Sequence, residues 1–162
     1  FNTALGYHGN SEDSAAAWRQ LADDPEGLHW CFTGDIGVMD GEGKVSIVDR
    51  SKDVIITGGE TVPSVEVEAL YAMHPDLYES SVVGIEDEKW GEVIVLVAVA
   101  AKADIDEAAL ANSLFEFGRG RLTGYKLPKR IAFVRSLPRT HFGKVLKRVL
   151  RKQVFERQFY AP

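Results

Sequence analysis

Apolar residues along this 162-residue chain follow two spacings, which separate the expected strands from the expected helices. The longest apolar run, residues 93–101, contains no polar side chain and is typical of a buried strand. Residues 36–49 predict a β-hairpin, because the turn-forming residues 40–43 (Asp-Gly-Glu-Gly) separate two apolar segments. Three more strands are expected, at residues 54–56, 81–85 and 131–134.

Other segments carry apolar residues at helical spacing. Residues 63–73 place Val67, Leu70 and Tyr71 on one face, and Ser64 is the expected N-terminal cap. These positions predict a helix that packs on the sheet through one apolar stripe.

Two further helices are expected in the second half of the chain. Asp104 is the expected cap of a helix over residues 106–117. The last helix is expected over residues 144–155, with Leu146 and Leu150 among its inward positions.

The order of these elements predicts an α+β fold, a small mixed sheet with packed helices. Residues 1–34 keep no regular period, and only residues 14–21 are compatible with a short helix. Since this stretch closes no core of its own, we expect it to be the tail of a larger upstream domain.

Charge is distributed unevenly between the two ends of the chain. Residues 119–162 contain 13 of the 19 Lys and Arg residues but only one of the 24 acidic residues, Glu156. This division fits a solvated helix face, docking on an acidic protein surface, or binding of a phosphorylated cofactor. Nucleic acid is the least favoured partner, because the basic residues follow no known binding motif.

Cysteine content and hydropathy bear on the cellular compartment and on membrane-spanning segments. Cys31 is the single cysteine, which fits a reducing cytoplasm, and its neighbours Trp30 and Phe32 favour a small buried side chain. The longest apolar run is far shorter than the ~20 residues of a membrane-spanning helix. We therefore expect no transmembrane segment.

Three short motifs carry candidate chemistry. Residues 33–35 (Thr-Gly-Asp) place a carboxylate beside a glycine, where it can accept hydrogen bonds from two vicinal hydroxyl groups. Residues 49–53 (DRSKD) end the predicted hairpin with a charged cluster. Residues 137–148 (LPRTHFGKVLKR) place Gly143 and Lys144 directly before a basic amphipathic segment.

In this order and spacing, the three motifs resemble the C-terminal signature of the adenylate-forming enzymes, specifically the acyl-CoA synthetases. The resemblance covers nearly the whole chain, and it implies that residues 1–51 are the end of a large adenylation domain and residues 52–162 a mobile C-terminal lid domain. It implies that Asp35 and Arg50 contact the ribose side of the nucleotide, and that Lys52 is the hinge about which the C-terminal domain turns. It also implies that Lys144 is the catalytic lysine, since an ammonium group can stabilise the charge that develops on the α-phosphate during adenylation.

The resemblance extends to a second surface, which would bind CoA and its pantetheine arm. Residues 56–63 (ITGGETVP) resemble the loop that lines the pantetheine tunnel, through Gly58, Gly59 and Glu60. Trp90, Tyr125 and Lys126 correspond to positions near the CoA nucleotide in relatives. Leu127 departs from the pattern, because some relatives carry an arginine there, and the phosphate contact is therefore in doubt.

The implied protein is an ATP-dependent, AMP-forming acid–thiol ligase that activates a carboxylic acid, with a fatty acid as the first candidate. It would use ATP, CoA and Mg²⁺, with the Mg²⁺ ligand and the acyl pocket upstream of this chain. The chain alone is expected to be inactive. Its own N-terminal domain is the expected partner, and a homodimer is left open.

Three alternatives remain at this point. The chain can be the lid of a peptide-synthetase adenylation domain, although the Gly58-Gly59-Glu60 sequence favours the CoA-ligase form. It can be a stand-alone interaction module with the same fold. It can also be a small polyanion-binding protein that uses its basic final third, which would show steep salt dependence.

Overall fold

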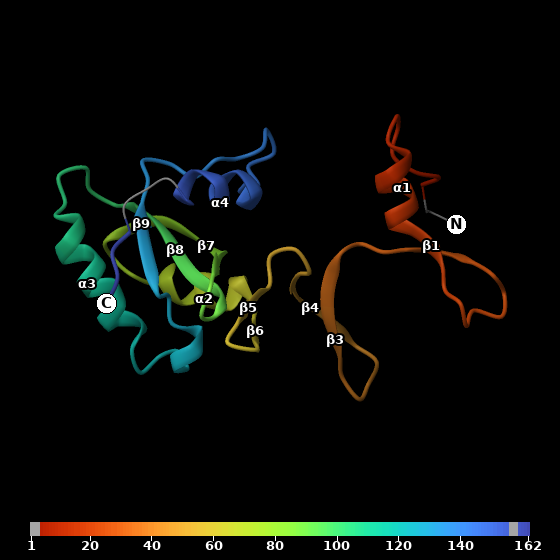
Figure 1. The fold of residues 1–162 in the computed structure, drawn as a ribbon, viewed down its shortest axis with the longest axis horizontal. Coiled ribbons are helices and arrows are strands. Elements are labelled where there is room, and N and C mark those ends of the chain that lie inside the picture. Colours follow the sequence, from red (N-terminus) through yellow and green to blue (C-terminus); the bar gives the residue numbers. More distant parts are fainter. Residues whose placement is uncertain (1–3, 156–158) are drawn as a thin grey trace. The chain divides into compact units, whose positions relative to one another are not determined.

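The computed structural model describes residues 4–155 and 159–162, which fall into two compact units (Figure 1). The first unit is Phe1–Lys52 and the second is Asp53–Pro162. Each is described by itself.

The first unit consists of one short helix and two antiparallel strand pairs. Helix α1 (Ser11–Ala17) leads into β1 (Trp18–Gln20), which pairs with β2 (His29–Cys31). Strands β3 (Asp35–Met39) and β4 (Val45–Arg50) form the predicted hairpin, closed by hydrogen bonds between Asp40 and Lys44. The hairpin is confirmed, whereas the helix expected at residues 14–21 begins and ends earlier and gives way to a strand.

The sheet of the second unit is mixed and has β8 (Gly91–Ala100) at its centre. Strand β7 (Leu77–Asp87) pairs antiparallel with β8 along one side. Strand β9 (Arg130–Phe133) pairs parallel with β8 on the other side, and β5 (Ile55–Thr57) pairs with β8 at Thr57 and Gly91. Strand β6 (Glu60–Val62) pairs antiparallel with β5 at the edge.

Helices cover both faces of this sheet. Helices α2 (Ser64–Tyr71) and α3 (Glu107–Gly118) pack on one face, and α4 (Lys147–Phe155) packs on the other (Figure 1). Along β8, alternate side chains therefore enter opposite cores: Ile94 and Leu96 face α2 and α3, whereas Val95 and Val97 face α4. This two-sided burial explains the uninterrupted apolar run and confirms the predicted α+β fold.

Several expected helix boundaries are wrong. Pro63, not Ser64, is the N-cap residue of α2, and the Ser64 hydroxyl accepts a hydrogen bond from Lys147. Asp106, not Asp104, caps α3, by accepting hydrogen bonds from the backbone N–H groups of two alanines. Helix α4 begins at Lys147, so Lys144 lies in the preceding loop and not within the helix.

Two predictions about burial also fail. Cys31 is exposed in the first unit, where β1 and β2 form a two-stranded sheet whose described residues are not fully buried. Leu146 is exposed because it precedes α4, and Leu150 and Val154 are the buried residues of that helix. In the described residues, no helix is both long and apolar enough to cross a membrane.

Candidate functional site

The hairpin of the first unit brings two predicted nucleotide-binding residues together. Asp35 and Arg50 are directly paired across β3 and β4, and the Arg50 Nε lies 3.3 Å from the Asp35 Oδ1. Gly34 has a φ of 77° and its carbonyl accepts a hydrogen bond of 2.8 Å from the Ser51 N–H. This turn fixes a carboxylate and a guanidinium side by side, both of them exposed.

Lys52 follows this hairpin directly. It is exposed in the turn between β4 and β5, and it is the last residue of the first unit. Its role as a hinge stays a prediction.

The glycine pair predicted to line the pantetheine tunnel forms the turn between β5 and β6. Gly58 and Gly59 have φ values of 60° and 84°, a conformation that other residues rarely adopt. The Gly58 N–H donates a 2.8 Å hydrogen bond to the carbonyl of Trp90, which lies in the turn between β7 and β8. Two motifs more than 30 residues apart therefore meet at one end of the sheet, where Glu60 is also exposed.

Trp90 occupies the space beside this turn. A Cβ atom on Gly58 would lie 3.1 Å from the Trp90 ring, and the ring is 41% exposed. The ammonium groups of Lys89 and Lys129 lie 5.1 and 5.8 Å from its centroid. The result is a half-exposed aromatic face flanked by positive charge, which suits a phosphorylated ligand with a planar ring.

We expect Gly58→Ala to displace the Trp90 ring and to cost about 1–2 kcal/mol in backbone strain. Gly59→Ala is the matched control, since it has the same positive φ but an added Cβ would meet nothing within 4 Å. Both variants should lose comparable stability in urea unfolding. The Trp90 emission should shift only in Gly58→Ala, and equal spectra in the two variants would contradict this packing.

The second segment predicted to contact CoA lies on a short 3-10 helix, η1 (Gly124–Lys126). Tyr125 is exposed, but the Lys126 ammonium is held 2.6 Å from a carboxylate oxygen of Glu66. This hydrogen bond raises the pKa of Lys126. Lys126 is thus a charged group that already has a protein partner, and a CoA phosphate would have to compete with Glu66 for it.

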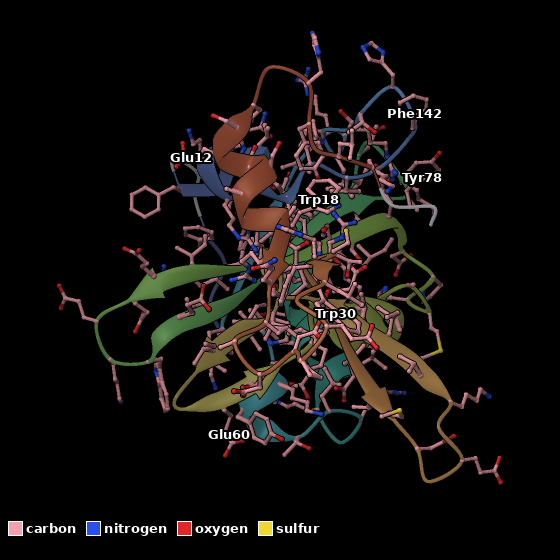
Figure 2. The ribbon with its side chains drawn as sticks, turned by 90° about the vertical axis from the view of Figure 1, so that its right-hand side faces the viewer. Glu12, Trp18, Trp30, Glu60, Tyr78 and Phe142 are labelled. Atoms are coloured by element: carbon pink, nitrogen blue, oxygen red, sulfur yellow. The ribbon has the colours of Figure 1, made fainter. Side chains whose placement is uncertain are left out.

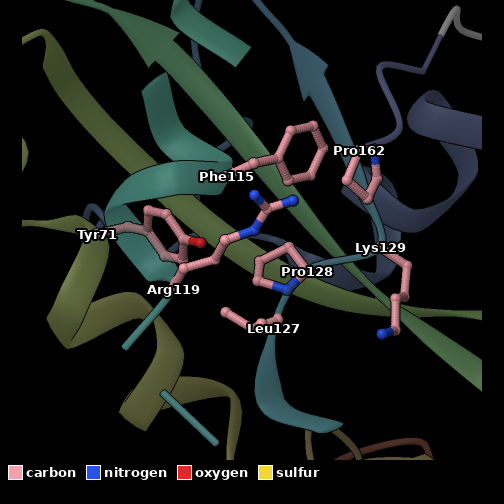
Figure 3. A pocket seen from close by; sticks show the side chains of 7 residues that line it. All are labelled: Tyr71, Phe115, Arg119, Leu127, Pro128, Lys129 and Pro162. Atoms are coloured by element: carbon pink, nitrogen blue, oxygen red, sulfur yellow. The ribbon is translucent and has the colours of Figure 1, made fainter. Parts of the chain in front are cut away.

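Leu127, the residue that departs from the family pattern, packs against the interior. It lines a cavity of about 180 Å³ together with Tyr71 and Pro128 (Figure 3). Burial raises the pKa of Tyr71 to about 12. An apolar side chain at this position is therefore explained by packing.

The loop before α4 presents Lys144 to solvent. Its ammonium group has no hydrogen bond or ion pair within residues 4–155 and 159–162. The neighbouring Phe142 is 94% exposed and projects from the same loop (Figure 2). Lys144 is therefore accessible to a ligand, and its catalytic role stays a prediction.

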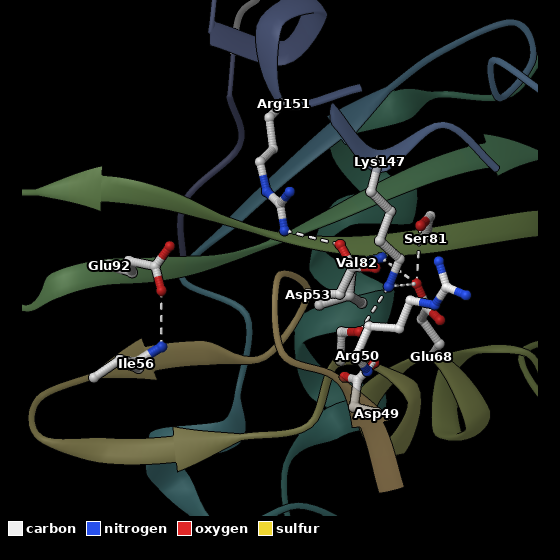
Figure 4. A network of polar contacts seen from close by, with 11 residues as sticks. Asp49, Arg50, Asp53, Ile56, Glu68, Ser81, Val82, Glu92, Lys147 and Arg151 are labelled. Atoms are coloured by element: carbon white, nitrogen blue, oxygen red, sulfur yellow. Dashed lines mark hydrogen bonds and ion pairs between the residues drawn. The ribbon is translucent and has the colours of Figure 1, made fainter. Parts of the chain in front are cut away.

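Sequence reasoning missed the groups that support these candidates. Glu92 accepts a 2.8 Å hydrogen bond from the Ile56 N–H and so supports the strand before the glycine turn (Figure 4). Glu79 and Glu68 pair with basic residues on either side of Lys144. These contacts join residues far apart in the sequence, so no local pattern could have indicated them. Within the residues that the structure describes, no three His, Cys, Asp or Glu side chains gather to hold a metal ion, and no step is assigned to Mg²⁺.

Comparison with known proteins supports the resemblance that the motifs indicate. Residues 66–144 match the family model of the AMP-binding enzyme C-terminal domain. The chain is 44% identical over 124 residues to the long-chain-fatty-acid–CoA ligase FadD13 of Mycobacterium tuberculosis, covering 76% of this chain and 24% of the relative. It is 42% identical over 154 residues to the 2-succinylbenzoate–CoA ligase of Geobacillus kaustophilus, covering 94% and 29%.

A solved structure shows the same similarity. The o-succinylbenzoate CoA synthetase of Bacillus subtilis, in complex with an acyl-adenylate intermediate, matches 94% of this chain and 28% of its own with a TM-score of 0.74 and 32% identity. The chain thus spans about a quarter of the length of the relatives it matches. The recognised resemblance is confirmed: residues 66–144 match the model of the AMP-binding enzyme C-terminal domain, and the two relatives described above are named as CoA ligases.

Proposed function

We propose that this chain is the C-terminal part of an ATP-dependent, AMP-forming acyl-CoA synthetase. The observation that carries the proposal is the exposed Lys144 ammonium, presented by a loop at the end of the family-matched segment. The substrates would be a carboxylic acid, ATP and CoA. A fatty acid is the first candidate acid, because FadD13 is named for long-chain fatty acids.

The first half-reaction would join the acid to the nucleotide. An oxygen of the substrate carboxylate attacks the α-phosphorus of ATP, and pyrophosphate leaves with the electron pair of the broken bond. Lys144 would stabilise the added negative charge on the α-phosphate, which is greater in the transition state than in the ground state. Asp35 would accept hydrogen bonds from the ribose hydroxyls, beside Arg50.

The second half-reaction would form the thioester. The CoA sulfur attacks the acyl carbon, the thiol proton passes to solvent, and AMP leaves. The glycine turn at Gly58 and Gly59 lets backbone approach a thin pantetheine arm, with Glu60 and Trp90 beside it. Tyr125 and Lys126 would lie near the CoA nucleotide.

One domain would serve both steps by rotating about Lys52. We propose residues 1–51 as the end of the large adenylation domain and residues 52–162 as the mobile domain. Rotation would withdraw Lys144 and bring the Gly58 turn to the acyl-adenylate. Mg²⁺ would be held by residues outside this chain, a homodimer stays open, and the lone Cys31 favours a cytoplasmic location.

The test uses the full polypeptide that contains these residues. We expect carboxylate-dependent exchange of pyrophosphate into ATP, and acyl-CoA formation when CoA is added. Asp35→Ala should raise the KM for ATP by about 10- to 100-fold, the loss expected for a hydrogen bond to a charged group.

Glu42→Ala is the control, because Glu42 is an exposed carboxylate in the turn of the same hairpin. It should leave the KM for ATP unchanged. Transfer of the acyl group to a carrier protein but not to CoA would overturn the proposal in favour of a peptide-synthetase lid.

A further inference from the structure

The loop that carries Lys144 is closed on itself by hydrogen bonds. The Thr140 N–H donates 2.8 Å to the Lys144 carbonyl, and the Gly143 N–H donates 2.9 Å to the Thr140 carbonyl. At its base, the Leu146 N–H donates 2.8 Å to the Pro138 carbonyl. Lys144 is therefore presented by a small hairpin-like loop, not by a loose segment.

At the N-terminal end of this loop, one anchoring residue links it to β7. The Arg139 guanidinium forms an ion pair with Glu79 and donates a 2.6 Å hydrogen bond to the Gly143 carbonyl, one residue before Lys144. Glu79 also accepts a hydrogen bond of 3.3 Å from the Leu137 N–H. A single arginine thus links the strand to the turn of the loop.

At the C-terminal end of the loop, a second anchoring residue links it to α2 (Figure 4). The Lys147 ammonium donates a 2.6 Å hydrogen bond to the fully buried Ser64 hydroxyl and lies 2.9 Å from the Glu68 Oε1. That Glu68 oxygen also accepts 2.8 Å hydrogen bonds from the Ser81 hydroxyl and the Val82 N–H of β7. The Lys147 side chain is 13% exposed, so this lysine is part of the interior.

Lys144 and Lys147 are therefore distinct in kind, although both belong to one basic segment. Lys144 is exposed and its ammonium is unpaired among the described residues. The Lys147 ammonium is hydrogen-bonded to Ser64 and forms an ion pair with Glu68. Lys144 faces solvent, whereas Lys147 links the start of α4 to two residues of α2. The two anchors lie on opposite sides of Lys144, at Arg139 and Lys147.

We infer that Arg139 and Lys147 are positioning residues, which hold the Lys144 loop at both ends so that the ammonium reaches the reacting phosphate in one geometry. This inference rests on the proposed function. A loop that is fixed before the substrate binds loses little conformational entropy in the transition state, and a displacement of about 1 Å can cost about 10²-fold in rate. Neither residue is expected to touch substrate.

The test compares each anchor with a basic neighbour in the full polypeptide. Arg139→Leu and Lys147→Met should each lower the kcat of acyl-adenylate formation by about 10- to 100-fold, with the KM for ATP nearly unchanged. Thioester formation from supplied acyl-adenylate should keep its rate. Arg135→Leu and Arg148→Met are the matched controls, since both arginines are exposed, and they should keep full activity. Lys147→Arg should restore most of the loss.

A double substitution separates positioning from a general effect on the fold. If Lys147 acts through Lys144, then adding Lys147→Met to Lys144→Ala should lower adenylation no further. A multiplicative loss in the double variant would overturn the inference. Unchanged adenylation in both anchor variants, with Lys144→Ala still slowed by about 10²- to 10³-fold, would overturn it and leave the proposed function intact.

Amide hydrogen exchange gives a readout that does not depend on activity. The N–H groups of Thr140, Gly143 and Leu146 should exchange faster in each anchor variant, while those of β8 should keep their protection. Unchanged exchange at these three amides would show that the anchors do not hold the loop, whatever reaction the protein catalyses. If Lys144→Ala itself retained full adenylation, the inference and the proposed function would fall together.

Discussion

Replacing Lys144 by alanine is expected to lower the rate of acyl-adenylate formation by about 10²- to 10³-fold, the loss typical of one group aimed at developing charge. The ammonium is exposed and without an ion pair in the described residues, so its removal leaves no buried partner uncompensated. The loop keeps its shape, because the Lys144 backbone and not its side chain makes the hydrogen bonds with Thr140. The effect should therefore fall on chemistry and not on folding.

Separate assays of the two half-reactions measure this effect. Pyrophosphate exchange should be lost in Lys144→Ala, while thioester formation from supplied acyl-adenylate should stay within a few-fold of the parent. Lys152→Ala is the control, since Lys152 is an exposed lysine on α4. Equal damage to both half-reactions would contradict the division of labour between Lys144 and the glycine turn.

Leu150→Ala should have the largest effect on stability, a loss of about 2–5 kcal/mol in the free energy of unfolding. Leu150 is fully buried in the apolar cluster between α4 and the sheet, with Val83 and Val97. Alanine would leave a cavity that the strands on the far side are too rigidly paired to fill. The same change would loosen the helix whose first residue, Lys147, anchors the Lys144 loop.

Urea unfolding of the 162-residue chain, followed by circular dichroism, measures this loss. Leu5→Ala is the matched control, because Leu5 is fully exposed and the same truncation there should change stability by less than about 0.5 kcal/mol. A similar midpoint for Leu150→Ala and the parent would show that α4 does not pack as described.

Local patterns predicted most of the sheet and its helices. The run at residues 93–101 became β8, because a strand covered on both faces needs apolar side chains at every position. The stripe of Val67, Leu70 and Tyr71 is buried as expected. Helix boundaries were less accurate. Ser64 is a residue type that favours an N-cap but lies inside α2, and Lys144 favours a helix but lies in the loop before α4.

The candidate site was predicted in part. The sequence identified Asp35 and Arg50 from separate motifs, and β3 and β4 place them side by side. It identified Gly58 and Trp90 separately, but only the sheet brings the two turns into contact. It proposed Lys126 as a positive charge near the CoA nucleotide, and only the structure shows that Lys126 is paired with Glu66.

By itself, the sequence predicted the α+β class and the order of most elements, since periodicity and turn residues act over a few residues at a time. Its motifs carried the resemblance to the acyl-CoA synthetases. Only the tertiary structure shows which of the many basic residues are accessible to solvent and which are held in hydrogen bonds or ion pairs with other residues. Lys144 and Lys147 are three residues apart and look alike in the sequence. They differ because the packing of α2 and of α4 against β7 brings Ser64 and Glu68 to Lys147, a contact between segments about 80 residues apart.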